Sequence, residues 1–424
     1  MKKLITLLLT AVMAVACCFG LTACGNNDDK EVIGEIAIPA VASDEVSKYD
    51  NYEISSDFKI GVICLHDETS TYDKNFIDSV KAAAKTLGLA DSQVLIATGI
   101  PEGGECTTKA NEFVAQGCKA IFADSFGHED FLIESAKVNP SVQFYHATGY
   151  KAAGAGLSNY HNAFASIYEG RYLAGVAAGL KLKEMNTQGK IKDANKDANG
   201  NVKIGYVGAY TYAEVISGLT SWYLGVKSQF PNVVMDVQFT GSWFDPTAEK
   251  AAAETLIGRG CALISQHADS MGAPGACEAA GIPNVSYNGS LINACPDTFI
   301  ISSKIDWTYY FKWIIAANGS NAEAIPTDFT GSLTNGMVAL SGINGDVAAE
   351  GTKDVIIAER TKLMNGTLKV FDCSKFTVNG EALTTETQNV LEADGVVYYN
   401  ESGIQSAPSF AFVIDGITFL NTEY

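Results

Sequence analysis

The stretch FKIGVICLHDETSTYDKNFIDSVKAAAKTLG, residues 58–88, changes its hydrophobic pattern once along its length. Its first eight residues, FKIGVICL, form a continuous apolar run of strand length, as in a strand buried on both faces. After Asp73 the apolar residues recur at helical spacing and stop at Gly88. These apolar residues are Phe76, Ile77, Val80, Ala84 and Leu87. A buried strand followed by an amphipathic helix predicts an α/β fold with a parallel sheet.

The same alternation of strand and helix continues along the chain and then repeats. QVLIAT (93–98), KAIFAD (119–124) and VQFYHA (142–147) have strand patterns, and a second series begins at VKIGYVGA (202–209). Lys59-Ile60-Gly61 recurs as Lys203-Ile204-Gly205, and GCKAIFADS (117–125) is echoed by GCALISQHADS (260–270). We therefore predict two doubly wound lobes of one topology, with a ligand cleft at the carboxyl ends of their strands.

The N-terminal segment has the layout of a bacterial lipoprotein signal. Two lysines precede an apolar run, and Leu21-Thr22-Ala23-Cys24 follows it, which predicts a signal peptide over 1–23 and a lipid on Cys24. Residues 24–57 are polar and acidic without a sustained period, so we expect a flexible tether between the membrane and a body that starts near Phe58. The ordinary alternative is a secretory signal peptide with a chance cysteine.

Composition excludes several classes of partner. Without residues 1–23 the chain has 27 basic and 48 acidic residues, a net charge of −21, which repels nucleic acid. Seven cysteines remain after Cys24, an odd number without CxxC spacing, which argues against a disulfide framework and a zinc site. They are Cys64, Cys106, Cys118, Cys261, Cys277, Cys295 and Cys373. We expect no metal and no cofactor.

Catalytic motifs are missing from the sequence. No GxSxG, Walker A or GxGxxG pattern occurs, and the cluster Gln266, His267 and Asp269 offers too few ligands for a metal site. The segments that follow the predicted strands are instead rich in aromatic, amide and carboxylate side chains, which suit a flat heterocycle with polar edges, such as a purine. We therefore expect a binding protein rather than an enzyme.

Four stretches together resemble the basic membrane protein family of lipoproteins, the purine-binding proteins of ABC uptake systems. They are KIGVICLHDETSTYDKNF (59–76), FASIYEGRYLAGVAAG (164–179), TGSWFDPTAEKAAAETLIGRG (240–260) and LKVFD (368–372). The resemblance covers nearly all of residues 58–375. It implies a type I periplasmic-binding-protein fold, in which crossing strands join the two lobes at a hinge. On this basis we expect lobe 1 to comprise 58–160 plus about 290–325, and lobe 2 to comprise 161–289 plus about 326–424.

The resemblance also implies site residues. The family motif that holds and stacks on the base is matched by Tyr72-Asp73-Lys74-Asn75-Phe76, so Asp73 is the firmest assignment. Other candidates from the cleft segments and the family pattern are Ser125, Phe126, Tyr210, Trp222, Trp243, His267, Asp269, Asn288, Lys304 and Trp307. The alternative for the aromatic candidates is a place in the core, which is as well supported as the cleft for Phe76, Trp222 and Trp243. Nucleoside-binding members carry Asp-x-Asp where this chain has Asn288-Gly289-Ser290, so a free base is the favoured ligand and a nucleoside the alternative.

Three functions stay open at this level. The first is a monomeric receptor that is anchored outside the cytoplasm by the lipid on Cys24 and delivers a purine to ABC permease subunits. The second is a surface lipoprotein that passes a ligand signal to a sensor. The third is an enzyme that turns over a purine.

Overall fold

The computed structural model describes residues 34–41 and 43–423. The predicted signal peptide and Cys24 lie outside the described residues. None of the helices in the described part of the chain is long and apolar enough to span a membrane.

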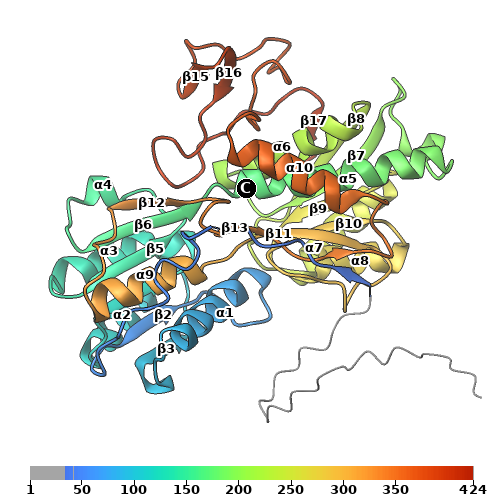
Figure 1. Cartoon of the computed structure of the whole chain (residues 1–424). Helices are drawn as coiled ribbons and strands as arrows, with labels where there is room; N and C mark the ends of the chain where they lie inside the picture. Colours follow the sequence, from blue (N-terminus) through green and yellow to red (C-terminus); the bar gives the residue numbers. More distant parts are fainter. Residues whose placement is uncertain (1–33, 42, 424) are drawn as a thin grey trace, which may run out of the picture. The chain divides into compact units, whose positions relative to one another are not determined.

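Lobe 1 is built around a six-stranded parallel sheet of order β12-β6-β5-β4-β2-β3 (Figure 1). Its strands are β2 (Ile60–Ile63), β3 (Val94–Ala97), β4 (Ala120–Ala123), β5 (Gln143–Ala147), β6 (Tyr160–Ala165) and β12 (Asp328–Gly331). Helices α1 (Thr71–Thr86) and α9 (Thr308–Gly319) pack together, as do α2 (Gly104–Ala115) and α3 (Glu129–Val138). The short helix α4 (Ala152–Ala155) precedes β6.

Lobe 2 repeats this topology and adds a strand. Its sheet has the order β13-β11-β10-β9-β7-β8-β17, parallel except for β13. The strands are β7 (Val202–Gly208), β8 (Val233–Phe239), β9 (Ile264–His267), β10 (Asn284–Tyr287), β11 (Phe299–Ile305), β13 (Val338–Leu340) and β17 (Ile417–Phe419). The helices are α5 (Ile167–Thr187), α6 (Ala213–Gln229), α7 (Pro246–Gly258), α8 (Gly272–Ala280) and α10 (Thr352–Met364). The shared strand order confirms the predicted repeat.

The expected lobe boundaries need correction. Strand β6 pairs with β5 and so belongs to lobe 1, whereas β11 pairs with β10 and belongs to lobe 2. Strand β12 returns to lobe 1, and β13 returns again to lobe 2. The chain therefore crosses between the sheets after β6, after β11 and after β12, and these three crossings form the hinge. The sequence pattern marked the strands but carried no signal for the sheet that each one joins.

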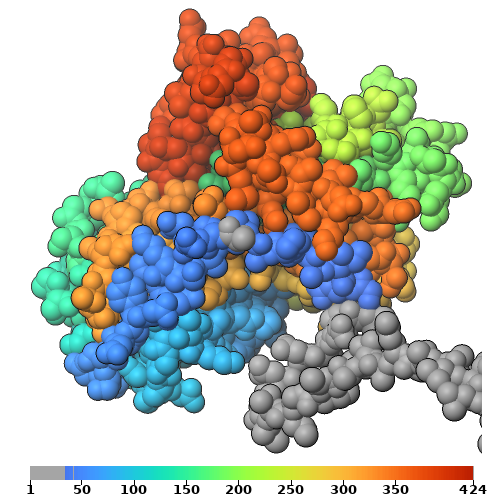
Figure 2. Space-filling view, in the orientation of Figure 1, coloured from blue at the N-terminus to red at the C-terminus, as the bar shows by residue number. Residues whose placement is uncertain are grey.

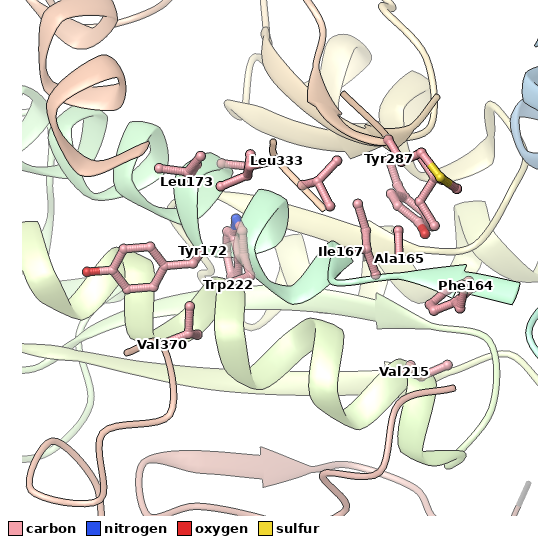
Figure 3. Close-up of a cluster of buried hydrophobic side chains, with 14 of the residues drawn as sticks. Phe164, Ala165, Ile167, Tyr172, Leu173, Val215, Trp222, Tyr287, Leu333 and Val370 are labelled. Carbon is pink, nitrogen blue, oxygen red and sulfur yellow. The ribbon is translucent and has the colours of Figure 1, made fainter. Parts of the chain in front are cut away.

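Helices α5 and α6 pack closely because glycines face each other where they meet. A Cβ atom on Gly175 would lie 2.1 Å from the carbonyl oxygen of Trp222, and one on Gly225 would lie 2.1 Å from that of Tyr172. Figure 3 shows Trp222 among the buried hydrophobic side chains of this region, together with Leu173. Only glycine allows this approach, so Gly175 and Gly225 permit the close packing of α5 on α6 in lobe 2.

The segment 34–57 is not the free tether that its composition suggested. Strand β1 (Glu35–Ile36) pairs antiparallel with β14 (Ile343–Asn344), which lies beside β11 in lobe 2. Farther along, the buried Tyr49 stacks on Trp313 of α9 with ring centroids 5.3 Å apart. The segment thus contacts both lobes, and we call it the strap (residues 34–57). Figure 2 shows it in dark blue across the face of the molecule.

The C-terminal residues add strand β17 to the lobe 2 sheet and contact strand β12 of lobe 1. Helix α10 packs on α5, the hairpin of β15 (Val390–Ala393) and β16 (Val396–Tyr399) follows, and β17 pairs with β8 at the edge of lobe 2. The backbone N–H of Ser406 donates a hydrogen bond to Asp328 of lobe 1 over 2.7 Å. This region therefore also contacts both lobes.

Candidate functional site

A pocket lies between the two lobes at the carboxyl ends of their strands. It holds about 360 Å³ of free space, including the part open to solvent. Lobe 1 contributes Leu65, His66, Tyr72, Asp73, Ser125, Phe126 and Thr148, and lobe 2 contributes Glu214, Trp243, His267 and Asp269. Because both lobes line it, opening and closing of the hinge would change the access to this pocket.

Direct hydrogen bonds hold the lobes together beside the pocket. The backbone N–H of Thr71 donates to the carbonyl oxygen of Asp269 over 3.0 Å. The Asn75 amide donates to the Asn288 side-chain oxygen over 3.2 Å, and the Asn288 amide lies 3.4 Å from Asp269 Oδ1. The structure is therefore a closed form of the molecule.

Asp73 organises the lobe 1 side of the pocket. It is buried at the start of α1, where its Oδ1 accepts a hydrogen bond from the His66 backbone N–H (2.8 Å) and its Oδ2 accepts one from the Ser70 hydroxyl (2.6 Å). Burial opposes the charge, but the hydrogen bonds from His66 and Ser70 outweigh it and lower the pKa of Asp73. Asp73 therefore presents an ionised carboxylate to the pocket at neutral pH.

On the lobe 2 side, His267 and Glu214 form a buried polar pair. Their nearest atoms, His267 Nε2 and Glu214 Oε1, lie 3.5 Å apart. Burial, and then the charge of Arg171, hold the pKa of His267 well below its usual range, so the imidazole is neutral. Burial raises the pKa of Glu214 to about 7 and that of Asp269 well above its usual range. This side can therefore both donate and accept hydrogen bonds.

Arg171 of α5 contacts two residues of the lobe 2 sheet behind the pocket. Its guanidinium donates a hydrogen bond to the carbonyl oxygen of Gln266 over 2.8 Å, and it lies 3.4 Å from the centroid of the Tyr287 ring. Arg171 is fully buried, so it fixes the strand that carries His267 rather than meeting solvent.

Aromatic side chains meet across the mouth of the pocket. Phe126 from lobe 1 lies 5.6 Å from Tyr212 of lobe 2, measured between ring centroids. Tyr212 stacks on Tyr210 at 4.9 Å, and Tyr210 meets the edge of Trp243 at 5.0 Å. In this closed form the rings approach one another, so a flat ligand would enter with the lobes apart and be enclosed when they close.

The structure brings half of the predicted site residues to the pocket. Those that line it are Tyr72, Asp73, Ser125, Phe126, Trp243, His267 and Asp269. Asn75 and Asn288 lie beside it and join the lobes, and Tyr210 packs against Trp243.

Four other predicted residues do not line the pocket. Phe76 and Trp307 are fully buried and stack on each other in the core of lobe 1 with ring centroids 4.7 Å apart. Trp222 is buried in the α5–α6 layer described above. Lys304 does not line the pocket, and its ammonium lies 3.9 Å from Asp306. Phe76, Trp222 and Lys304 follow the facing of α1, α6 and β11, and Trp307 lies in the turn between β11 and α9.

Four pocket residues escaped the sequence prediction: Leu65, His66, Thr148 and Glu214. All four fall in segments that directly follow predicted strands, so position along the chain was a usable signal. Thr148 also has a positive φ of 68°, which is rare outside glycine, although the sequence does not reveal it.

The family model described as ABC transporter substrate-binding protein PnrA-like matches residues 60–372. The chain belongs to this PnrA-like family. Family members are extracytoplasmic substrate-binding proteins of ABC transporters, which agrees with a pocket between two lobes. The strap and the residues after 372 lie outside the matched region.

The relatives of this PnrA-like chain are named after different ligands. It is 34% identical to a purine-binding protein of Brucella abortus (strain 2308), over 50% of this chain and 55% of the relative. It is 32% identical to a Haloferax volcanii protein described as a candidate ABC transporter glucose-binding protein, over 62% of each chain. A nucleoside-binding protein of Lactococcus lactis is 24% identical over 52% of this chain and 58% of the relative. The chain thus spans about six-tenths of the relatives it matches.

Solved structures support the fold of this PnrA-like chain. A solute-binding protein from Conexibacter woesei superimposes with a TM-score of 0.57 at 20% identity, covering 74% of this chain and 98% of that one. One from Aeropyrum pernix gives 0.55 at 16% identity, over 74% and 93%. At this identity the likeness concerns architecture alone, and it confirms the predicted type I periplasmic-binding-protein fold.

We expect the buried glutamates of this PnrA-like protein to contribute more stability at pH 5 than at pH 8, against an opposite contribution from buried histidines such as His146 and His267, whose pKa values burial lowers. Burial raises the pKa of Glu169, Glu214 and Glu249 to about 7 each, from 4.5. Between these values the unfolded chain is ionised while the folded chain keeps the protons, so their contribution is present below pH 4.5 and lost as pH rises through 7. A carboxyl whose pKa is one pH unit higher in the folded chain contributes about 1.4 kcal/mol in this way.

Urea unfolding of ligand-free protein at several pH values checks this prediction. Glu214→Gln should flatten the curve, because the amide mimics the protonated acid at every pH. A difference in stability between the native protein and Glu214→Gln that is the same at pH 5 and at pH 8 would contradict the raised pKa of Glu214.

Proposed function

We propose that this chain captures a purine, as the free base, in the pocket between its lobes and delivers it to an ABC permease. The observation that carries the proposal is the pairing of aromatic rings with ionised and neutral polar groups around one closed pocket. Phe126 and Trp243 offer faces and edges for a flat ring, while Asp73 and His267 offer hydrogen-bonding groups for its edge. The purine-binding and nucleoside-binding relatives support the same ligand class.

The hydrogen bonds around Asn288 favour the free base over a nucleoside. A carboxylate grips a vicinal diol through two charge-assisted hydrogen bonds, whereas Asn288 is neutral. Its side-chain oxygen is occupied by Asn75 and its amide faces Asp269. Lys304 lies outside the pocket beside Asp306. A sugar would therefore lose hydration without gaining well-paired partners, which disfavours its burial.

We predict that adenine, guanine, hypoxanthine or xanthine binds at least as tightly as its own nucleoside. Paired calorimetric titrations on ligand-stripped protein check this, with glucose and an amino acid as controls. A nucleoside that binds tenfold more tightly, about 1.4 kcal/mol, would reverse the preference. Binding of glucose alone would replace the purine class by the sugar class that one relative's name carries.

We further propose that a lipid on Cys24 anchors the protein to the bacterial membrane. Cys24→Ala is expected to release the protein into the soluble fraction, since two or three acyl chains hold firmly where one does not. Membrane fractionation of the full-length chain and the variant checks this. Membrane association that persists in Cys24→Ala would contradict the anchor, whereas Cys18→Ala, in the apolar run, serves as the matched control and should stay membrane-bound.

The alternative partner is a sensor rather than a permease. The pocket would serve either role, because both need a ligand that stabilises the closed lobes. Uptake of labelled purine by cells with and without the gene distinguishes transport from signalling.

A further inference from the structure

Beneath the pocket, four buried side chains of lobe 1 converge from four separate segments. Cys64 follows β2, Asp73 lies in the first turn of α1, Asp124 follows β4, and His128 ends the short 3₁₀ helix Phe126–His128. Ligand atoms of Cys64, Asp73 and Asp124 all lie within 4.8 Å of one another. His128 stands outside this set of three, with its Nδ1 atom 4.0 Å from Asp124 Oδ1. The exposed fraction of each side chain is 1% or less.

The hydrogen bond of His128 leaves its other nitrogen ready to bind a cation. Nε2 lies 2.9 Å from the carbonyl oxygen of Ile100, which can only accept, so Nε2 carries the proton. Nδ1 then holds a free lone pair, and it has no hydrogen-bond partner among the residues that the structure describes. Burial also lowers the pKa of His128, which keeps the ring neutral. This is the tautomer that metal-binding histidines adopt when a carbonyl oxygen holds the other nitrogen.

Asp124 is held in place through one oxygen, whereas Asp73 is held through both, since its Oδ2 also accepts from the Ser70 hydroxyl. The Leu65 N–H donates to Asp124 Oδ1 over 3.2 Å, and the His66 N–H donates to Asp73 Oδ1 over 2.8 Å. Asp124 Oδ2 is buried without a hydrogen-bond partner in the described part of the chain. A buried carboxylate oxygen without a partner is costly, so a cation that stabilises its charge would be favoured there.

Carboxyl groups dominate the electrostatics of the cluster, where the nearest ion-pair partner of Asp73 is the His66 imidazole, 3.4 Å from its Oδ2. Burial raises the pKa of Asp124, and the neighbouring Asp73 carboxylate raises it further. Burial, followed by the charge of Asp124, raises the pKa of the Cys64 thiol. A bound divalent cation reverses this situation, because it stabilises the deprotonated forms of both groups.

We propose that Cys64, Asp73, Asp124 and His128 bind one zinc ion beneath the pocket. One thiolate, one imidazole and two carboxylates are ligand types that zinc accepts in a four-coordinate site. Binding displaces the thiol proton of Cys64 to solvent and any proton held on Asp124, and no redox step is involved. Asp73 belongs to both the pocket and this cluster, so the open cleft gives the ion its route of entry. The proposal does not depend on the identity of the solute.

Cobalt(II) is the probe, because cobalt bound to a thiolate absorbs light in a way that cobalt bound to surface carboxylates or histidines does not. Full-length protein is stripped of metal and solute and titrated with cobalt. We expect saturation at one ion per chain with a thiolate-to-cobalt absorption band, which one equivalent of zinc abolishes. No band, or saturation far from one ion per chain, would overturn the proposal and leave Asp73 and Asp124 as a carboxyl pair that shares a proton.

Variants identify the ligands. Cys64→Ser should lose the band, whereas Cys118→Ser, which changes a buried thiol of lobe 1 outside the cluster, should keep it. Asp124→Asn and His128→Gln should weaken zinc binding at least tenfold. If Cys64→Ser fails to fold, the nearly isosteric Asp124→Asn decides the question: zinc should raise the melting temperature of the native protein and leave that of the variant unchanged. Equal shifts in both would overturn the site.

Discussion

Replacement of Trp307 by alanine is expected to lower the free energy of unfolding by about 3–5 kcal/mol, as for other fully buried aromatic residues. Trp307 stacks on Phe76 and lies 5.8 Å from Phe122, measured between ring centroids. Its backbone N–H also donates a hydrogen bond to the Ser79 hydroxyl oxygen over 3.1 Å. The cavity left by the indole would open where the chain crosses from β11 to α9. Urea denaturation measured by circular dichroism gives the change.

Trp243→Ala is the matched control for that prediction. This indole is only half-buried and lines the pocket, so its loss should weaken solute binding while changing stability much less. The two variants together separate the core tryptophan from the pocket tryptophan. A Trp307 variant with native stability and impaired binding would restore Trp307 to the site.

Asp73→Ala is expected to weaken purine binding by about ten- to a hundredfold. Its carboxylate holds the His66 backbone and the Ser70 hydroxyl, so the variant loses a charged hydrogen-bonding group and leaves buried donors without a partner. Such losses cost about 1–3 kcal/mol, and more when a charge is involved. Calorimetry on ligand-stripped variants measures the effect, which should exceed that of His267→Ala.

The control for Asp73 lies on the same helix. Asp78 is exposed and pairs with Lys74 on the surface, so Asp78→Ala should bind purine as the native protein does. Affinity that survives in Asp73→Ala would remove this carboxylate from the purine site, while the cobalt titration would still test it as a metal ligand.

Local patterns predicted the strands, the repeat and the position of the pocket, because buried parallel strands and amphipathic helices leave clear periodicities. They failed where burial depends on distant segments. Phe76 follows the same helical spacing as Ile77 and Val80, so its own periodicity already indicated the core. The family motif suggested a ligand contact instead. Glu214 has the appearance of an ordinary charged residue in the first turn of a helix, and only the fold around it raises its pKa.

Two further features had no sequence signal of their own. The cluster of Cys64, Asp73, Asp124 and His128 draws on four segments, so no short spacing motif marks it. The strap has an acidic and polar composition, yet the pairing of β1 with β14 and the stacking of Tyr49 on Trp313 dock it on both lobes. Average composition describes a segment poorly when a few large side chains provide most of its buried area.

The strap is attached first to lobe 2 and then to lobe 1 along its length. Its first residues are fastened to lobe 2, where Gly345 donates to the carbonyl oxygen of Gly34 and Arg360 donates to that of Pro39. From Val46 onward it is fastened to α9 of lobe 1, where Lys312 donates to the carbonyl oxygen of Val46. The seven peptide units between Pro39 and Val46 span at most about 25 Å when extended. The strap therefore limits how far the two lobes can separate. Along the chain the strap reaches lobe 2 before lobe 1, so the proposed anchor on Cys24 would hold the protein through lobe 2.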